Sequence, residues 1–212
     1  MKSHALMHEA GLRVIQLDHT AVSLTCGRYL YLLSDPPDWW LHETIASMSL
    51  DASLILGVCL SSRAAATCDV ALMVVEALRR AGHVSPPFSE DLRLTITELI
   101  ANAHLHGNLE DVSPLEADDE LYRRGISLSV ARGVRKIVLT VANQSTRTWG
   151  GRRYAPIGRP VMPGTPVLGL GLKIVRDMGG EIDHTDDLSR WTVVFSIPAG
   201  HGSLADPHRI PE

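Results

Sequence analysis

The chain has 212 residues, 45% of them hydrophobic, and a formal net charge of -4 from 20 basic and 24 acidic side chains. This length and composition suit one ordinary domain with an extension, with enough apolar surface for a sizeable core. The acidic balance and the lack of a run of Lys or Arg argue against direct binding of nucleic acid.

Membrane and disulfide classes are also excluded by composition. No apolar segment reaches the roughly 18 residues that a membrane span requires, and the N-terminus lacks a signal-peptide pattern. Cys26, Cys59 and Cys68 are odd in number and have no CxxC spacing, which argues against a disulfide framework or a zinc site. We therefore expect a soluble cytoplasmic protein with reduced thiols and no membrane partner.

The N-terminal part of the chain combines short β-rich runs with one helix. β-Branched content and partial alternation predict strands at 12–17, 20–26 and 29–33. The Asp-Pro-Pro punctuation that follows precedes a predicted helix over Trp39–Met48, and Ala52–Cys59 is the next predicted strand. This part is either a separate cap or an extension of the main sheet.

Two amphipathic helices are predicted next, and they should pack side by side. The first runs over Arg63–Ala81 and stops at Gly82. The second runs over Ser89–Asn108, with Ser89 as its N-cap. Its apolar face consists of Leu92, Ile96, Leu99, Ile100 and Ala103.

One edge of the second helix carries chemically active side chains. Glu98, Asn102 and His106 follow one another at i+4 steps, so a carboxylate, an amide and an imidazole share this edge. Taken alone, the same pattern also describes the solvated side of an ordinary amphipathic helix.

Two pairs of strands complete the predicted sheet. Ile126–Ala131 and Lys136–Ala142 are joined at a Gly-containing hairpin turn, and Glu181–His184 is followed by Trp191–Ile197. An antiparallel sheet with helices on one face follows, which is an α+β two-layer arrangement. Residues 109–124 are predicted to form a solvated acidic loop.

A glycine-rich segment lies between these two pairs of strands. Gly164, Gly169 and Gly171 lead into a helical pattern that begins at Leu172, so backbone amides at a helix N-terminus could face an anion such as phosphate. Residues 144–167 are basic and rich in glycine, which fits either a lid over a phosphate site or a mobile surface loop.

The two motifs together resemble a known superfamily. Residues 98–108, ELIANAHLHGN, resemble the N box, and residues 169–175, GLGLKIV, resemble the second glycine box, of the GHKL ATP-binding proteins that include gyrase, histidine kinases and MutL. The helix from Arg63, the Gly82-His-Val-Ser turn and the NAxxHGN run are most similar to bacterial anti-sigma-factor serine kinases. The resemblance covers about residues 52–198.

The resemblance implies a Bergerat-type ATP-binding fold, a two-layer α/β sandwich with an antiparallel-rich mixed sheet and helices on one face. It divides the chain into a β-rich N-terminal extension or cap over 1–50, a GHKL-like ATP-binding domain over 51–198 and a disordered tail over 199–212.

The resemblance also implies the roles of individual residues. Asn102 would be a ligand of Mg²⁺, and Glu98 would be the general base that polarises a substrate hydroxyl or a water. His106 would contact phosphate or cap the helix end. The remaining candidates fall into two groups: those in the phosphate-binding loop are Gly164, Gly169, Leu170, Gly171 and Leu172, and those beside adenine are Asn143 and Thr192.

The first glycine box departs from the family pattern. Asn143-Gln144-Ser145 stands where the family has an adenine-binding Asp followed by a glycine-containing turn. Asn143 keeps a carbonyl acceptor but not the charge, and that weakens the expected hydrogen bond to adenine by about 1 kcal/mol. A purely structural role of Asn143 in closing a turn is the alternative.

Three functions remain open at this point. The first is a serine/threonine protein kinase of the anti-sigma type, which uses ATP and Mg²⁺, phosphorylates an antagonist-like protein, binds a sigma factor and forms a homodimer, as the family commonly does. The second is a catalytically inactive binding module or switch in bacterial signalling. The third and weakest is phosphotransfer through His42, because the strand predicted at 52–59 interrupts the helical hairpin that such a histidine needs.

Overall fold

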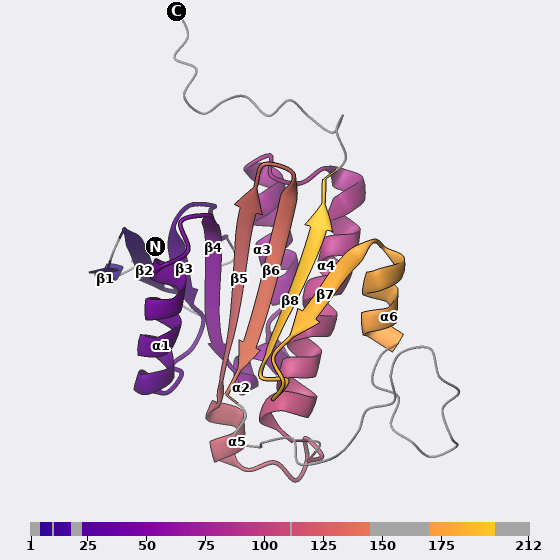
Figure 1. Ribbon diagram of the computed structural model, residues 1–212. Coiled ribbons are helices and arrows are strands. Elements are labelled where there is room, and N and C mark those ends of the chain that lie inside the picture. Colours follow the sequence, from indigo (N-terminus) through magenta and orange to yellow (C-terminus); the bar gives the residue numbers. More distant parts are fainter. Residues whose placement is uncertain (1–4, 10, 18–22, 111, 145–169, 198–212) are drawn as a thin grey trace, which may run out of the picture.

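The computed structural model describes residues 5–9, 11–17, 23–110, 112–144 and 170–197. Its centre is an eight-stranded sheet with the order β1-β2-β3-β4-β5-β6-β8-β7 (Figure 1). The strands are β1 (Ala5–Glu9), β2 (Leu12–Gln16), β3 (Tyr29–Leu32), β4 (Leu54–Ser61), β5 (Gly125–Gly133), β6 (Lys136–Asn143), β7 (Gly180–His184) and β8 (Arg190–Ser196).

The sheet is mixed but mostly antiparallel. The β2–β3 and β3–β4 pairs are parallel, and the other five pairs are antiparallel. The predicted α+β class is therefore confirmed, as are the strand pairs on either side of the glycine-rich segment. The predicted strand at 20–26 is wrong for its described residues, because 23–26 do not form a strand; residues 20–22 lie outside the described part.

Helices occur on both faces of the sheet. They are α1 (Asp38–Ser49), α2 (Ser62–Thr67), α3 (Val70–Arg80), α4 (Pro86–Asn102), the π-helix η1 (Ala103–Asn108), α5 (Asp119–Arg123) and α6 (Leu170–Asp177). Figure 1 shows α3 and α4 behind the sheet and α1 in front of its N-terminal strands.

The placement of α1 corrects the prediction that helices cover one face only. Strand β3 alternates strictly, with Tyr31 in the large core cluster under α3 and α4 and with Leu30 and Leu32 in a second cluster. Ile45 and Met48 of α1 complete this second cluster. The N-terminal strands are thus apolar on both faces, and each face needs a cover.

The main core lies between β4–β8 and the helices α3, α4 and α6. All five predicted apolar positions of the Glu98 helix are buried in it, as are Ile137, Leu139 and Val141 of β6. Because side chains alternate along a strand, Val138, Thr140 and Ala142 face the opposite side of the sheet. The predicted amphipathic face of α4 is therefore confirmed.

The predicted helix over Arg63–Ala81 is two helices in the structure. Cys68 has extended backbone angles, with φ -109° and ψ 133°, and ends α2. The carboxylate of Asp69 then accepts a hydrogen bond from Leu72 N at 2.9 Å and caps α3. An Asp inside an otherwise helical pattern therefore begins a new helix here.

The predicted start of the Glu98 helix is also wrong. Helix α4 begins at Pro86 with Ser85 as its N-cap, whereas Ser89 is buried inside the first turns and its hydroxyl donates to Pro86 O. Proline is favoured at the first helical position because its missing N–H has no helical partner there. Pro86 and Pro87 therefore form the first two residues of the helix.

Predictions were also made for the acidic segment 109–124, for the lid and for the tail. Residues 109–124, predicted as a loop, include the short helix α5, whose first turn is capped by Asp118. The predicted lid lies outside the described residues, apart from Gln144, and so does the predicted tail over 199–212. Among the described helices, none is long and apolar enough to cross a membrane.

Candidate functional site

Glu98 and Gly171 meet where α4 passes the first turn of α6. Glu98 is half-buried, and its carboxylate lies so close to the Cα of Gly171 that an added Cβ would overlap it. Only glycine leaves room for the carboxylate at this point. The structure thus brings together the predicted general base and the N-terminal turn of the predicted phosphate-binding helix.

The rest of the predicted edge continues along α4 into η1. Asn102 is the last residue of α4, one turn beyond Glu98, and it is half-buried. His106 lies in η1 and is also half-buried. Glu98 and Asn102 therefore share an edge of α4, as the spacing predicts. His106 lies in the π-helix η1, where the α-helical spacing behind its predicted place on that edge does not hold.

Asn143 contacts η1 rather than open solvent. It is 3% exposed, and a Cβ built on Gly107 would come within 2.5 Å of its side-chain Cγ. Asn143 continues the inward-facing series of Leu139 and Val141, so its amide lies between the sheet and η1. Its backbone N–H donates to Ser189 O at 2.8 Å. Asn143 is thus on the same side of the sheet as Glu98.

Thr192 is not brought together with the other predicted residues. It pairs with Thr140 across β6 and β8, and their hydroxyl groups are 3.3 Å apart on the face of the sheet opposite to α4. Its neighbour Val193 points into the core instead. A contact from the Thr192 side chain to an adenine beside Asn143 would have to pass through the sheet.

The predicted phosphate-binding loop is only partly described. Gly164 and Gly169 lie outside the described residues. Leu170 begins α6, and Leu172 is buried at 4% exposure in the main core, where it anchors the helix beneath Glu98. The backbone of Gly171 and Leu172 is thereby held at the N-terminal turn of α6.

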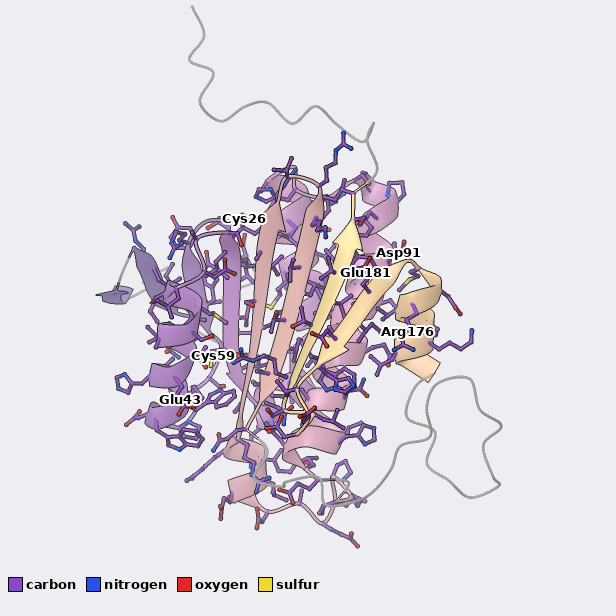
Figure 2. The ribbon with its side chains drawn as sticks, in the orientation of Figure 1. Cys26, Glu43, Cys59, Asp91, Arg176 and Glu181 are labelled. Atoms are coloured by element: carbon purple, nitrogen blue, oxygen red, sulfur yellow. The ribbon has the colours of Figure 1, made fainter. Side chains whose placement is uncertain are left out.

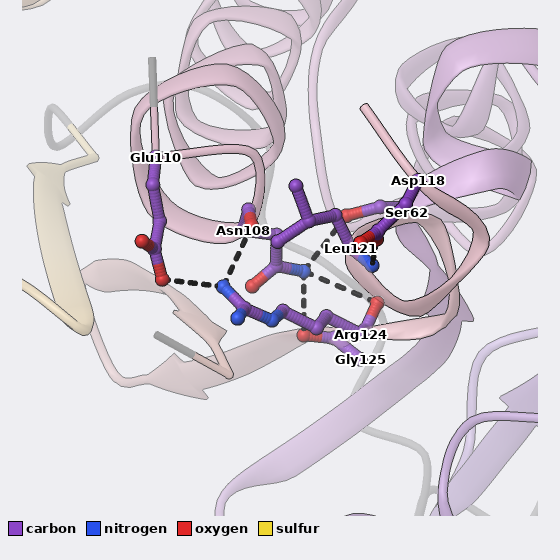
Figure 3. Close-up of polar contacts among 7 residues, drawn as sticks. All are labelled: Ser62, Asn108, Glu110, Asp118, Leu121, Arg124 and Gly125. Atoms are coloured by element: carbon purple, nitrogen blue, oxygen red, sulfur yellow. Dashed lines mark hydrogen bonds and ion pairs between the residues drawn. The ribbon is translucent and has the colours of Figure 1, made fainter. Parts of the chain in front are cut away.

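Sequence reasoning missed the residues that hold the end of η1. Asn108 is fully buried, and its side-chain amide donates to Ser62 Oγ at 2.8 Å and to the carbonyl oxygens of Arg124 and Gly125 at 3.1 Å each (Figure 3). Ser62 is 46 residues away in the sequence. In the sequence, the only sign of this role of Asn108 was a polar residue after the Gly in NAxxHGN, and that pattern is also typical of an ordinary helix end.

Cys59 is buried and Cys26 is partly buried, and both thiols have raised pKa values. Burial raises the pKa of Cys59 to about 12 and that of Cys26 to about 11. Figure 2 shows Cys59 near α1 and Cys26 at the other end of the N-terminal strands. Both therefore stay protonated at neutral pH, and the three cysteines are free, as predicted.

Two histidines, His83 and His104, have lowered pKa values. Burial lowers the pKa of His104 below its usual 6.5, and burial together with the Arg132 guanidinium lowers that of His83. His104 is 8% exposed, and its Nδ1 has no hydrogen-bond partner among the described residues. Both imidazoles therefore bind a proton more readily in the unfolded chain.

We expect the free energy of unfolding to decrease as the pH falls below about 6.5, because the unfolded state then binds more protons than the folded state. Replacing His104 by Gln should flatten this pH dependence, as measured by urea denaturation at several pH values. His42→Gln, at an exposed position on α1, is the matched control. An unchanged slope in His104→Gln would show that His104 does not couple folding to protonation.

Comparison of the chain with protein-family models gave no match, and comparison with curated proteins gave none either. The residues described above therefore carry the functional argument by themselves.

Proposed function

We propose that this chain is an adenine-nucleotide-binding regulatory protein of the GHKL type, and that it acts as a serine/threonine protein kinase of the anti-sigma class. The observation that carries the proposal is the contact between the Glu98 carboxylate and Gly171. It joins the two motifs, which are about seventy residues apart in the sequence and resemble the N box and the second glycine box.

The residues at this contact suit phosphoryl transfer. A helix N-terminus offers free backbone amides to an anion, and the missing side chain of Gly171 lets another group approach that turn closely. Glu98 can accept a proton from a hydroxyl group there. Asn102, one turn further on, offers the amide oxygen that would hold Mg²⁺, which when bound neutralises phosphate charge.

The partners follow from the proposed class. The protein substrate would be an antagonist-like regulator, the second partner a sigma factor, and the chain itself would form a homodimer in the bacterial cytoplasm. His42 is exposed on α1, across the sheet from Glu98, so the site gives it no part in the transfer.

A second candidate is a nucleotide-binding switch without turnover. The burial of Asn143 against Gly107 favours this second candidate, because the neutral amide can pack the sheet against η1 as well as it could bind adenine. Binding of ATP without transfer to any hydroxyl of a partner protein would select this candidate.

The test is calorimetric titration of the protein with ATP in the presence of Mg²⁺ and, separately, of excess EDTA. We expect binding with Mg²⁺ and a loss of about tenfold or more in affinity for Asn102→Ala, which corresponds to about 1.4 kcal/mol. Thr97→Ala is the control. Thr97 is exposed on a different side of α4 from Asn102, so this variant should bind ATP like the parent. Absence of binding heat and of any thermal shift with millimolar ATP and Mg²⁺ would refute the proposal.

A further inference from the structure

Asn108 makes an unusually dense set of contacts for one side chain. Its amide nitrogen faces three acceptors, Ser62 Oγ and the carbonyl oxygens of Arg124 and Gly125. Backbone carbonyls can only accept, so the nitrogen and not the oxygen of the amide must point toward them. The contacts join the end of η1 to the starts of α2 and β5 (Figure 3).

Arg124 binds the same turn from the other side. Its Nη1 donates to Asn108 O at 2.9 Å and to Glu110 Oε1 at 2.6 Å, and both members of the ion pair are nearly buried, with side-chain exposures of 11% and 13%. Its carbonyl oxygen accepts from Ser62 N at 2.9 Å. Ser62, Asn108, Glu110 and Arg124 therefore form one connected group, which we call the Asn108 cluster.

The cluster holds a helix end of uncommon geometry. Leu109 N donates to His104 O at 2.9 Å, five residues back, which is the hydrogen bond of a π-turn. Relaxation of this turn to an α-helix would shift the register by one residue and rotate the following side chains by about 100°. Anchoring Asn108 opposes that rotation.

The rotation would act directly on the predicted site. Gly107, next to Asn108, is pressed against Asn143, and His106 precedes it on the same turn. Both positions face their present neighbours only while η1 keeps its register. The fixed end of the helix is thus connected to the part of the site where sequence reasoning places adenine and phosphate.

We propose that Asn108 is a positioning residue of the nucleotide site: together with Ser62 and Arg124 it holds η1 in its π-helical register and so keeps His106 and Gly107 in place beside Asn143. The inference rests on the proposed function for the identity of the ligand. A purely structural role would lower stability without a selective effect on the site, and the experiment separates the two.

The experiment compares Asn108→Asp, Ser62→Ala and Leu32→Ala with the parent. Asn108→Asp keeps the shape but turns an oxygen toward two carbonyl oxygens, and Ser62→Ala removes one acceptor and is the milder variant if the first fails to fold. Leu32→Ala creates a cavity in the separate cluster under α1 and serves as the matched destabilised control. Two readouts are used at a temperature where all are folded: the Kd for ADP with Mg²⁺, and amide hydrogen exchange.

We expect Asn108→Asp to weaken ADP binding by roughly tenfold or more, an effect comparable to loss of the residues that orient metal ligands, and Ser62→Ala to weaken it less. Exchange should accelerate selectively at residues 103–109. Leu32→Ala should leave both the Kd for ADP and the exchange at residues 103–109 unchanged. Parental affinity in Asn108→Asp, or exchange that accelerates evenly over the chain, would overturn the inference.

The two proposals fail in different ways. If the parent protein binds no nucleotide, the proposed function is refuted and with it the ligand named here. The exchange comparison still decides whether Asn108 holds the register of η1, since it needs no nucleotide.

Discussion

Replacing Glu98 by Gln is expected to slow phosphoryl transfer by about 10²- to 10⁴-fold, the usual contribution of a general base. ATP affinity should change little, because a general base acts in the transition state and contributes little to ground-state binding. Gln keeps the shape of the side chain beside Gly171 and its acceptor oxygen but cannot take up the proton. Single-turnover transfer from radiolabelled ATP to the partner protein measures the effect.

Gly171→Ala tests the same contact from the opposite side. A Cβ at Gly171 would overlap the Glu98 carboxylate, and this flexible group can move away, so the protein should stay folded while transfer falls about as far as in Glu98→Gln. Gly133→Ala is the control, because the nearest atom to its Cβ would be Lys136 Cβ at 3.8 Å, which is an ordinary contact. Parental transfer rates in both site variants would remove Glu98 from the mechanism.

Phe195→Ala is expected to lower the free energy of unfolding by about 3 to 5 kcal/mol, the range for loss of a buried phenylalanine. Phe195 on β8 is 2% exposed, and its ring meets that of Phe88 on α4 edge to face, with 5.2 Å between ring centroids. Truncation would leave a cavity between the sheet and the start of α4 and remove this aromatic pair. Urea denaturation monitored by circular dichroism measures the loss.

The neighbouring strand position provides the control. Val194 points to the opposite face of the sheet and is only partly buried, so Val194→Ala should cost less than about 1 kcal/mol. Equal losses in the two variants would contradict the assignment of β8 residues to the two faces.

The elements with strong local periodicity could be predicted from the sequence. The five apolar residues of the Glu98 helix lie on one stripe and all are buried, and the two predicted strand pairs, β5 with β6 and β7 with β8, form as expected. Boundaries were harder, because Asp69 reads equally well as a surface position of one long helix or as the cap of a new one. The burial of β3 on both faces depends on which strands lie beside it in the sheet, and the hydrophobic periodicity of a strand does not identify its neighbours.

The candidate site was predictable only as far as its motifs. Glu98 and Asn102 share an edge because of helical spacing, whereas the approach of Glu98 to Gly171 depends on tertiary packing of α4 on α6. The inward or outward direction of Thr192 depends on the strand register, in which a shift of one residue reverses every side chain. Asn108 was missed because its partners come from distant segments.

The N-terminal strands cover a side of β4 that would otherwise be an edge of the sheet. Strand β3 pairs with β4 through Leu30, Tyr31 and Leu32, so the sequence-based division at residue 50 cuts through a continuous ladder. A chain that began after that division would still pair β4 with β5, but the side of β4 that now faces β3 would become a long, apolar edge. Such edges recruit strands from other molecules, so a chain that lacks residues 1–50 is expected to aggregate.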